Sequence, residues 1–172
     1  MPANVELRPG TLEDEWLTVA LETDPRVMAE LGSAWTEEQA RATHRRRIAG
    51  ATEHGWWWLV IVPGPGRQPI GSIGLWASEW EGGPISETGW MVLPEHQGKG
   101  YATAALATLL ERVRDDPRWG DIHAFPGSTN APSNALCRKF GFELLDEVTV
   151  EYADRPLTCN RWVLRARHAP AS

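Results

Sequence analysis

The chain has few cysteines and no long hydrophobic run. Its two cysteines, Cys137 and Cys159, are too few for a disulfide framework and lack the spacing of a zinc site. No stretch approaches the roughly 18 apolar residues that span a bilayer. The N-terminus, MPANVELRPG, lacks the basic and then apolar pattern of a signal peptide. We therefore expect a cytoplasmic protein in a reducing compartment, with no metal and no membrane partner.

Positive charge is also scarce. The chain has 17 Lys and Arg against 23 Asp and Glu, a net charge of −6. General nucleic-acid binding needs a basic face, so we expect no nucleic-acid partner, although a few local groups suffice for a small anionic ligand. The length of 172 residues, 42% of them hydrophobic, predicts a single domain over 1–172 with an ordered core of about 5–165. Such a domain is compatible with a monomer or a homodimer.

Apolar and turn residues predict an α/β fold. Strands are predicted at 5–8, 56–62, 70–77, 85–93, 120–125, 142–152 and 157–165, and helices at 12–20, 36–48, 98–114 and 132–140. Residues 22–35 are expected to form a short helix and a loop. Gly50 is expected to end the second helix and residues 81–84 to form a turn. This order predicts a mixed central sheet of about six or seven strands flanked by about four helices.

The segment QGKGYAT, residues 97–103, places glycines where a helix should begin. A P-loop is excluded because no glycine stands five positions before Gly98 and Gly100 follows Lys99. A dinucleotide fingerprint fits poorly, because Thr103 holds the third glycine position and Asp121 begins the next strand instead of ending it. Two interpretations of this segment remain: a phosphate cradle, in which the backbone amides at the start of the helix hold a phosphate group, and a simple tight turn.

The cradle has a physical basis in the helix terminus. The first N–H groups of a helix lack intrahelical partners and carry partial positive charge, so they attract phosphate oxygens. Gly98 and Gly100 have no Cβ atoms to keep a phosphate from the backbone. The side chain of Lys99 is then expected to point to water.

Two blocks carry a family resemblance. Residues 87–103, ETGWMVLPEHQGKGYAT, resemble the central motif of the GNAT superfamily of acetyl-CoA-dependent N-acetyltransferases, in which a strand precedes a small-residue loop. Residues 130–142, NAPSNALCRKFGF, resemble a second block of the branch that includes ribosomal-protein alanine acetyltransferases, and residues 5–9 resemble its opening strand. Two blocks in order are far more specific than either alone.

The resemblance implies a fold and a coenzyme site. It implies a GNAT-like sheet that splays between the fourth and fifth strands, so that the pantetheine arm of acetyl-CoA enters the gap and pairs with the fourth strand. Backbone amides of the glycine loop would hold the pyrophosphate. The coenzyme-binding residues that it implies are Met91, Val92, Leu93, Gln97, Gly98, Lys99, Gly100, Tyr101, Ala102, Thr103, Asn130 and Ser133.

Amine acetylation needs proton transfers, because most of a primary amine is protonated at neutral pH. Glu87 is the first candidate for the base, because it lies early on the strand that leads to the glycine loop. The alternative for Glu87 is a solvated glutamate at the end of a strand. Glu79 is the second candidate for the base. Many family members carry a tyrosine as general acid where this chain has Cys137. Ser133 or a water relay is then the acid, and Cys137 is expected to be a buried apolar residue. His123 is expected to be packed, with proton relay as its alternative role.

The acceptor is predicted to be an amine. Trp76, Glu79 and Trp80 are the candidate acceptor-binding residues, because aromatic walls are common in ligand sites, while alternation along the strand turns Trp90 toward the core. The branch resemblance favours a peptide or protein N-terminus over a small-molecule amine such as an amino acid, a polyamine or an antibiotic. A non-catalytic acyl-CoA-binding module is the third alternative.

Overall fold

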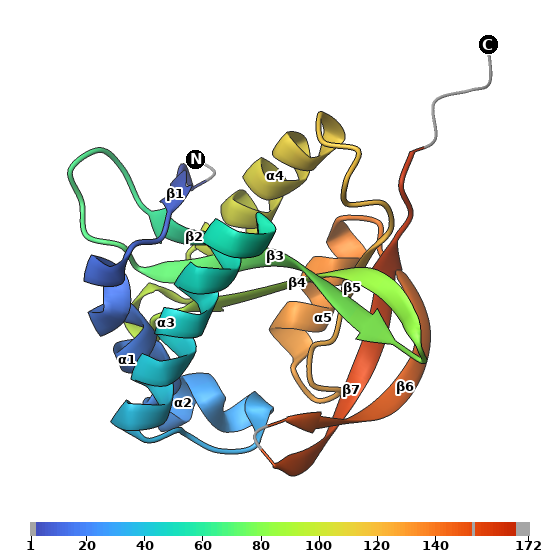
Figure 1. The fold of residues 1–172 in the computed structure, drawn as a ribbon, viewed down its shortest axis with the longest axis horizontal. Coiled ribbons are helices and arrows are strands. Elements are labelled where there is room, and N and C mark those ends of the chain that lie inside the picture. Colours follow the sequence, from blue (N-terminus) through green and yellow to red (C-terminus); the bar gives the residue numbers. More distant parts are fainter. Residues whose placement is uncertain (1–2, 153, 168–172) are drawn as a thin grey trace.

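One sheet of seven strands organises the chain. The computed structural model describes residues 3–152 and 154–167, and the sheet has the order β1-β2-β3-β4-β5-β7-β6 (Figure 1). The strands are β1 (Glu6–Pro9), β2 (Trp57–Val62), β3 (Gly71–Trp80), β4 (Gly83–Val92), β5 (Ile122–Ala124), β6 (Glu143–Tyr152) and β7 (Arg155–Leu164). Neighbouring strands pair antiparallel except β4 and β5, which are parallel. The predicted mixed α/β sheet is confirmed.

Five α-helices flank this sheet in the described part of the chain, against about four predicted. They are α1 (Glu15–Glu22), α2 (Pro25–Met28), α3 (Glu37–His54), α4 (Tyr101–Arg114) and α5 (Ala131–Lys139), with short 3-10 turns at Leu12–Asp14, Ala29–Leu31 and Pro94–His96. The short helix expected within residues 22–35 is α2, a single turn that begins with Pro25 after the capping residue Asp24. Within the ranges described, no helix is long and apolar enough to cross a membrane.

Glycine conformation explains where the predicted boundaries were wrong. Helix α3 does not end at Gly50 but continues to the left-handed Gly55. Gly50 lies inside the helix because its missing side chain admits the ring of Trp56, which would lie 2.2 Å from a Cβ. Helix α4 begins at residue 101 instead of 98, because Gly98 and Gly100 have φ of 70° and 83°, outside the helical region.

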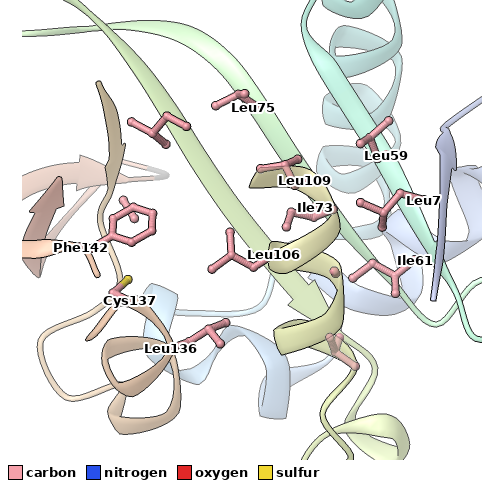
Figure 2. Close-up of a cluster of buried hydrophobic side chains, with 14 of the residues drawn as sticks. Leu7, Leu59, Ile61, Ile73, Leu75, Leu106, Leu109, Leu136, Cys137 and Phe142 are labelled. Carbon is pink, nitrogen blue, oxygen red and sulfur yellow. The ribbon is translucent and has the colours of Figure 1, made fainter. Parts of the chain in front are cut away.

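The main core lies between the sheet and helices α4 and α5. Leu106 and Leu109 of α4 pack against Ile73 and Leu75 of β3, and all four side chains are fully buried (Figure 2). The same cluster takes in Leu136 and Cys137 of α5 with strand residues of β1, β2, β5 and β7. Alternation along the strands therefore turns one face of the sheet toward α4 and α5.

The opposite face packs against α1. Leu17 and Leu21 of α1 form a second cluster with Val60 and Val62 of β2, and Met91 of β4 packs on it. Because side chains alternate along a strand, the other residues of β4 that share the Met91 face also point away from α4 and α5.

Strands β4 and β5 stay together over only three residue pairs, Ser86–Ile122, Glu87–His123 and Thr88–Ala124. Beyond Thr88, β4 continues to Val92 against β3 on its other side. The last four residues of β4 thus have no strand partner from β5, which is the predicted splay between the fourth and fifth strands.

Candidate functional site

The splay leaves one edge of β4 unpaired just before the glycine loop. The N–H of Leu93 donates to the C=O of Ile70, 2.8 Å away, so the backbone groups of Leu93 face the β3 side. Backbone groups alternate along an extended strand, so those of Met91 also face β3 and those of Val92 face the gap. The C=O of Val92 accepts a 2.9 Å bond from the side-chain amide of Gln97. Of the three predicted backbone contacts, Val92 is therefore the one whose polar groups line the gap.

The glycine loop has the geometry of an open helix terminus. Gly100 is left-handed, and the first intrahelical bond at this end of α4 runs from the N–H of Ala104 to the C=O of Gly100. The amides of residues 101–103 come before that bond. A Cβ at Gly98 would meet nothing within 4 Å, and residues 97–100 are exposed. The loop thus offers donors and unobstructed space to an anionic group.

The second block forms the start of α5. The side chain of Asn130 accepts a bond from the backbone N–H of Ser133 and so caps the helix, and Ser133 is half-buried. Asn134 was not singled out from the sequence, although it lies within residues 130–142. Its amide donates to the C=O of Gly127 and its oxygen accepts from the indole of Trp162. This network fixes the turn between β5 and α5.

Cys137 is a core residue. It is 0% exposed, and burial raises the pKa of its thiol to about 12. Such a thiol stays protonated at neutral pH, as expected for a buried apolar residue. Cys159 is also buried, and burial together with the charge of Glu87 raises the pKa of its thiol to about 11.

Glu87 lies where the splay begins. It shares the α1-facing side of β4 with Met91 and is half-buried, with Trp76 opposite it on β3 and His123 opposite it on β5. Burial raises the pKa of Glu87, and hydrogen bonding by the side chains of Ser78 and Trp76 partly offsets this rise. A carboxyl group with a raised pKa is better matched to accepting a proton near neutral pH.

Trp76 packs beside this carboxyl group. Its ring covers Gly74 on its own strand and Gly89 on β4, where added Cβ atoms would lie 3.1 and 3.3 Å from ring atoms. Glu79 is exposed, and alternation along β3 places it on the face opposite to Trp76. The structure therefore brings Trp76 to Glu87 and does not bring Glu79 there.

Trp80 belongs to an aromatic group at the end of the β3–β4 hairpin. Its ring lies 5.1 Å from that of Phe125, and the guanidinium of Arg161 lies 5.3 Å from the Trp80 centroid. Phe125 in turn stacks on His123. His123 is buried, which lowers its pKa, as predicted for a packed histidine. Trp90 packs against the main core on the other face, also as predicted.

Three further residues form a group that was not predicted. Glu22, the last residue of α1, is fully buried. Trp35, from the loop before α3, stacks on Tyr152 at the end of β6 with ring centroids 5.7 Å apart. Burial and the charges of Glu22 and Glu87 raise the pKa of Tyr152 to about 12. Each residue stands alone in a segment without a motif, so the sequence carried no signal for the group.

Comparison with known families identifies the chain. The family described as "Acetyltransferase (GNAT) domain" matches residues 4–143, which is most of the chain. The protein belongs to the GNAT acetyltransferase family. This result confirms the resemblance that the two sequence blocks indicated, and it makes the protein an acyltransferase.

Solved structures agree on the fold. RimL, a ribosomal alpha-N-protein acetyltransferase in complex with coenzyme A, has 15% identity and a TM-score of 0.77 over 94% of each chain. Spermidine N-acetyltransferase from Vibrio cholerae in complex with CoA and spermine has 16% identity and a TM-score of 0.76, over 94% of this chain and 95% of that one. An aminoglycoside acetyltransferase in complex with coenzyme A has 18% identity and a TM-score of 0.73 over the same shares. At such identities the likeness shows the fold and leaves the acceptor open.

The described residues hold no cluster of three or more His, Cys, Asp or Glu side chains suited to a metal ion. The site combines a donor-rich helix terminus, an unpaired strand edge and a half-buried carboxyl group. Such a set can bind an anionic thioester along β4 and accept a proton from a nucleophile that approaches from the α1 face.

Proposed function

We propose that the protein transfers the acetyl group of acetyl-CoA to a primary amine, with Glu87 as the base. The observation that carries this proposal is the position of Glu87, half-buried in the pair before the last one that joins β4 to β5, and five residues before the end of β4 at Val92. A base at that position meets an amine that enters the gap from the α1 face.

The coenzyme fits the glycine loop and the free edge of β4. The pyrophosphate would take the amides of residues 98–102, since the N–H of Gln97 already donates to the C=O of Pro94, and the open space at Gly98 leaves room for it. The pantetheine arm would bond to the C=O of Val92. The N–H of Val92 or that of Met91 is the candidate oxyanion donor, and alternation favours Val92 because its N–H faces the gap.

The reaction then needs three proton transfers. Glu87, directly or through water, takes a proton from the ammonium form of the acceptor, and the neutral nitrogen attacks the thioester carbonyl. The nitrogen of the tetrahedral intermediate then loses a second proton as the carbon–sulfur bond breaks, and Ser133 or water relays this proton to the departing thiolate. The buried thiol of Cys137, with its pKa of about 12, is not suited to this donation because it lies in the apolar core.

The favoured acceptor is the N-terminal amine of a peptide or protein. The likeness of residues 130–142 to the ribosomal-protein branch supports it, as does the structural likeness to RimL. Small-molecule amines are the second candidate, because structures of spermidine and aminoglycoside acetyltransferases match almost as well. A non-catalytic acyl-CoA-binding module has less support, because Glu87 is present and its pKa is raised. Both cysteines are free, consistent with the proposed cytoplasmic location.

A screen of amines with acetyl-CoA tests the proposal. Peptides with free N-termini, amino acids, polyamines and aminoglycosides are incubated with the protein, thiol release is followed, and products are identified by mass spectrometry. We expect an acetylated product that is 42 mass units heavier than its acceptor, about the mass an acetyl group adds when it replaces a proton. Saturable binding of acetyl-CoA without thiol release across the whole panel would overturn the enzyme proposal.

A further inference from the structure

The connection between α1 and α3 is a loop that is closed at its base. The N–H of Trp35 donates a 2.8 Å bond to the C=O of Glu22, the last residue of α1. Residues 23–34, which we call the α1–α3 loop, lie between these two positions. The loop contains α2, and Met28 at the end of α2 is 0% exposed. The α1–α3 loop is therefore packed onto the protein and does not project into solvent.

The far end of the α1–α3 loop contacts the turn that follows β5. Oε2 of Glu30 accepts a 2.7 Å bond from the hydroxyl of Thr129. The C=O of Glu30 also lies against Gly127, where an added Cβ would be 2.8 Å from its oxygen. Gly127 is held in place from the other side, because its own C=O accepts a 2.9 Å bond from the side-chain amide of Asn134 on α5. Glu30 thus fastens the loop to a turn that α5 fixes.

This contact lies at the edge of the gap between β4 and β5. The last pair that joins the two strands is Thr88–Ala124, and Gly127 follows Ala124 by three residues. Gly127 forms a bridge with Cys159 of β7, so the chain beyond β5 continues beside β7 and borders the gap opposite residues 89–92 of β4. Glu30 therefore contacts the β5 side of the gap.

The base of the α1–α3 loop lies on the same face of the sheet as Glu87. The ring of Trp35 stacks on Tyr152 with centroids 5.7 Å apart, and Figure 1 shows the chain running from α1 past α2 to the end of the β6–β7 hairpin. The strand pairs that relate Tyr152 to Glu87 are Glu87–His123, His123–Val163 and Arg155–Tyr152. Val163 and Arg155 are an even number of residues apart on β7, and side chains alternate along a strand, so Tyr152 and Glu87 share a face.

We propose that the α1–α3 loop selects acceptors by width. It admits a primary amine on a slender chain, such as an extended peptide end or a linear aliphatic amine, and excludes an amine flanked by a ring. The inference rests on the proposed function, which supplies the acceptor. An acceptor that reaches Glu87 from this face passes beside a loop that is fastened at its base by Trp35 and at its far end by Glu30. A loop held at both ends yields little to a wide group, and such a clash lowers the rate for the wrong acceptor.

Matched acceptors test the inference in the unaltered protein. One pair is heptylamine and cyclohexylmethylamine, which have the same number of carbon atoms and carry the amine on a methylene group. The other pair is two peptides that differ only in norleucine or cyclohexylalanine as first residue. We expect kcat/KM to be about 10-fold or more higher for the linear member of each pair that is acetylated, which is the usual size of a steric preference in a fitted site.

Variants then assign the preference to the fastening of the loop. E30A removes the carboxylate that bonds to Thr129, and T129V removes the hydroxyl with little change of shape. Both should lower the linear-to-cyclic ratio of kcat/KM several-fold, mainly by raising kcat/KM for the cyclic member. E38A makes the same Glu-to-Ala change at an exposed position in the first turn of α3, outside the loop, and should keep the ratio. Amide hydrogen exchange of residues 23–34 should be faster in E30A and unchanged in E38A.

The outcomes separate the inference from the proposed function. Equal kcat/KM for linear and cyclic acceptors in the unaltered protein would overturn the inference while leaving the proposed function intact. A ratio that stays the same in E30A and T129V, both still binding acetyl-CoA, would also overturn it, as would unchanged exchange of the loop in E30A. Failure of the unaltered protein to acetylate any amine would instead refute the proposed function, and the inference with it.

Discussion

The indole of Trp76 on β3 covers Gly89 on β4, where a Cβ would come within 3.3 Å of the ring atom Cη2. Gly74, on the same strand as Trp76, would place a Cβ 3.1 Å from the same ring. Two glycines thus leave the space in which the ring lies next to Glu87. The position of this ring, and the hydrogen bonding that it gives Glu87, depend on the absence of both side chains.

Gly89→Ala should therefore displace Trp76 and lower kcat/KM for the amine several-fold. A contact of 3.3 Å is shorter than ordinary packing, so the ring must move by a few tenths of an ångström. Gly83→Ala is the matched control, because Gly83 is on the same strand as Gly89 and its Cβ would lie 3.6 Å from the nearest atom, the backbone oxygen of Trp80 on β3. Steady-state kinetics with both variants check this prediction, and equal activity of the two would show that the ring position does not matter.

Glu87→Gln should lower kcat/KM by about 10²–10⁴-fold, the usual contribution of a general base. The loss should be greatest just above the pKa of Glu87 and should shrink at alkaline pH, where the amine loses its proton to water. Binding of acetyl-CoA, measured by calorimetry, should change little. Glu79→Gln is the control, since Glu79 is exposed on the opposite face. Equal activity of Glu87→Gln at every pH would contradict the role of Glu87 as the base.

Ser78→Ala should move the acid limb of the kcat/KM profile to higher pH. Burial raises the pKa of Glu87, and the hydroxyl of Ser78 opposes that rise by bonding to the carboxylate. Without the hydroxyl, less remains to offset the effect of burial, so the pKa of Glu87 rises further. The ionised form of Glu87, which accepts the proton, then appears only at higher pH. A pH–rate profile with a well-used acceptor measures the shift. An acid limb at the unchanged pH would show that another group titrates.

Local patterns explain what could be predicted. Alternation along β4 put Glu87 and Trp90 on opposite faces, and helical spacing in α4 marked Leu106 and Leu109 as core, because both periods are properties of a single element. The ends of α3 and α4 were less predictable. Gly50 accommodates the ring of Trp56 from the connection before β2, which is a contact that helical periodicity does not contain.

The group formed by Glu22, Trp35 and Tyr152 was the least predictable part. Glu22, Trp35 and Tyr152 come from α1, a loop and the β6–β7 hairpin, and only the fold brings them together. The glycine loop was recognisable because a phosphate site is built from consecutive amides. An amine pocket is built from single side chains on several elements, so a sequence can name candidates such as Trp76 without showing their neighbours.

Gly100→Val should weaken coenzyme binding by about 10-fold or more, the effect of losing a hydrogen bond to a charged group. Gly100 has φ of 83°, so a β-branched residue would both disturb the left-handed turn and bring a side chain to the phosphate space. Gly141→Val separates the two effects, because Gly141 also has a positive φ of 80° but follows α5. Calorimetry with acetyl-CoA should find weaker binding only in Gly100→Val; unchanged affinity there would refute the phosphate cradle.

Asp14→Asn should destabilise the protein by about 1–3 kcal/mol at neutral pH, because a buried carboxylate loses charge-assisted bonds. Asp14 is 4% exposed and accepts bonds of 2.8 and 2.9 Å from Arg8 and one of 2.8 Å from the N–H of Thr11. Burial by itself raises the pKa of Asp14, but the bonds from Arg8 and Thr11 outweigh it and lower the pKa overall.

The pH dependence gives this prediction its sign. A carboxyl group whose pKa is lower in the folded state contributes its full stability above the pKa of the unfolded chain, and loses it as pH falls through the folded pKa. The gap in unfolding free energy between the unaltered protein and Asp14→Asn should therefore narrow on acidification, as measured by urea unfolding at several pH values. Glu13→Gln, an exposed neighbour, should stay within about 0.5 kcal/mol of the unaltered protein. If this difference in unfolding free energy did not change with pH, the destabilisation by Asn would come from altered packing, and the charge of Asp14 would contribute nothing.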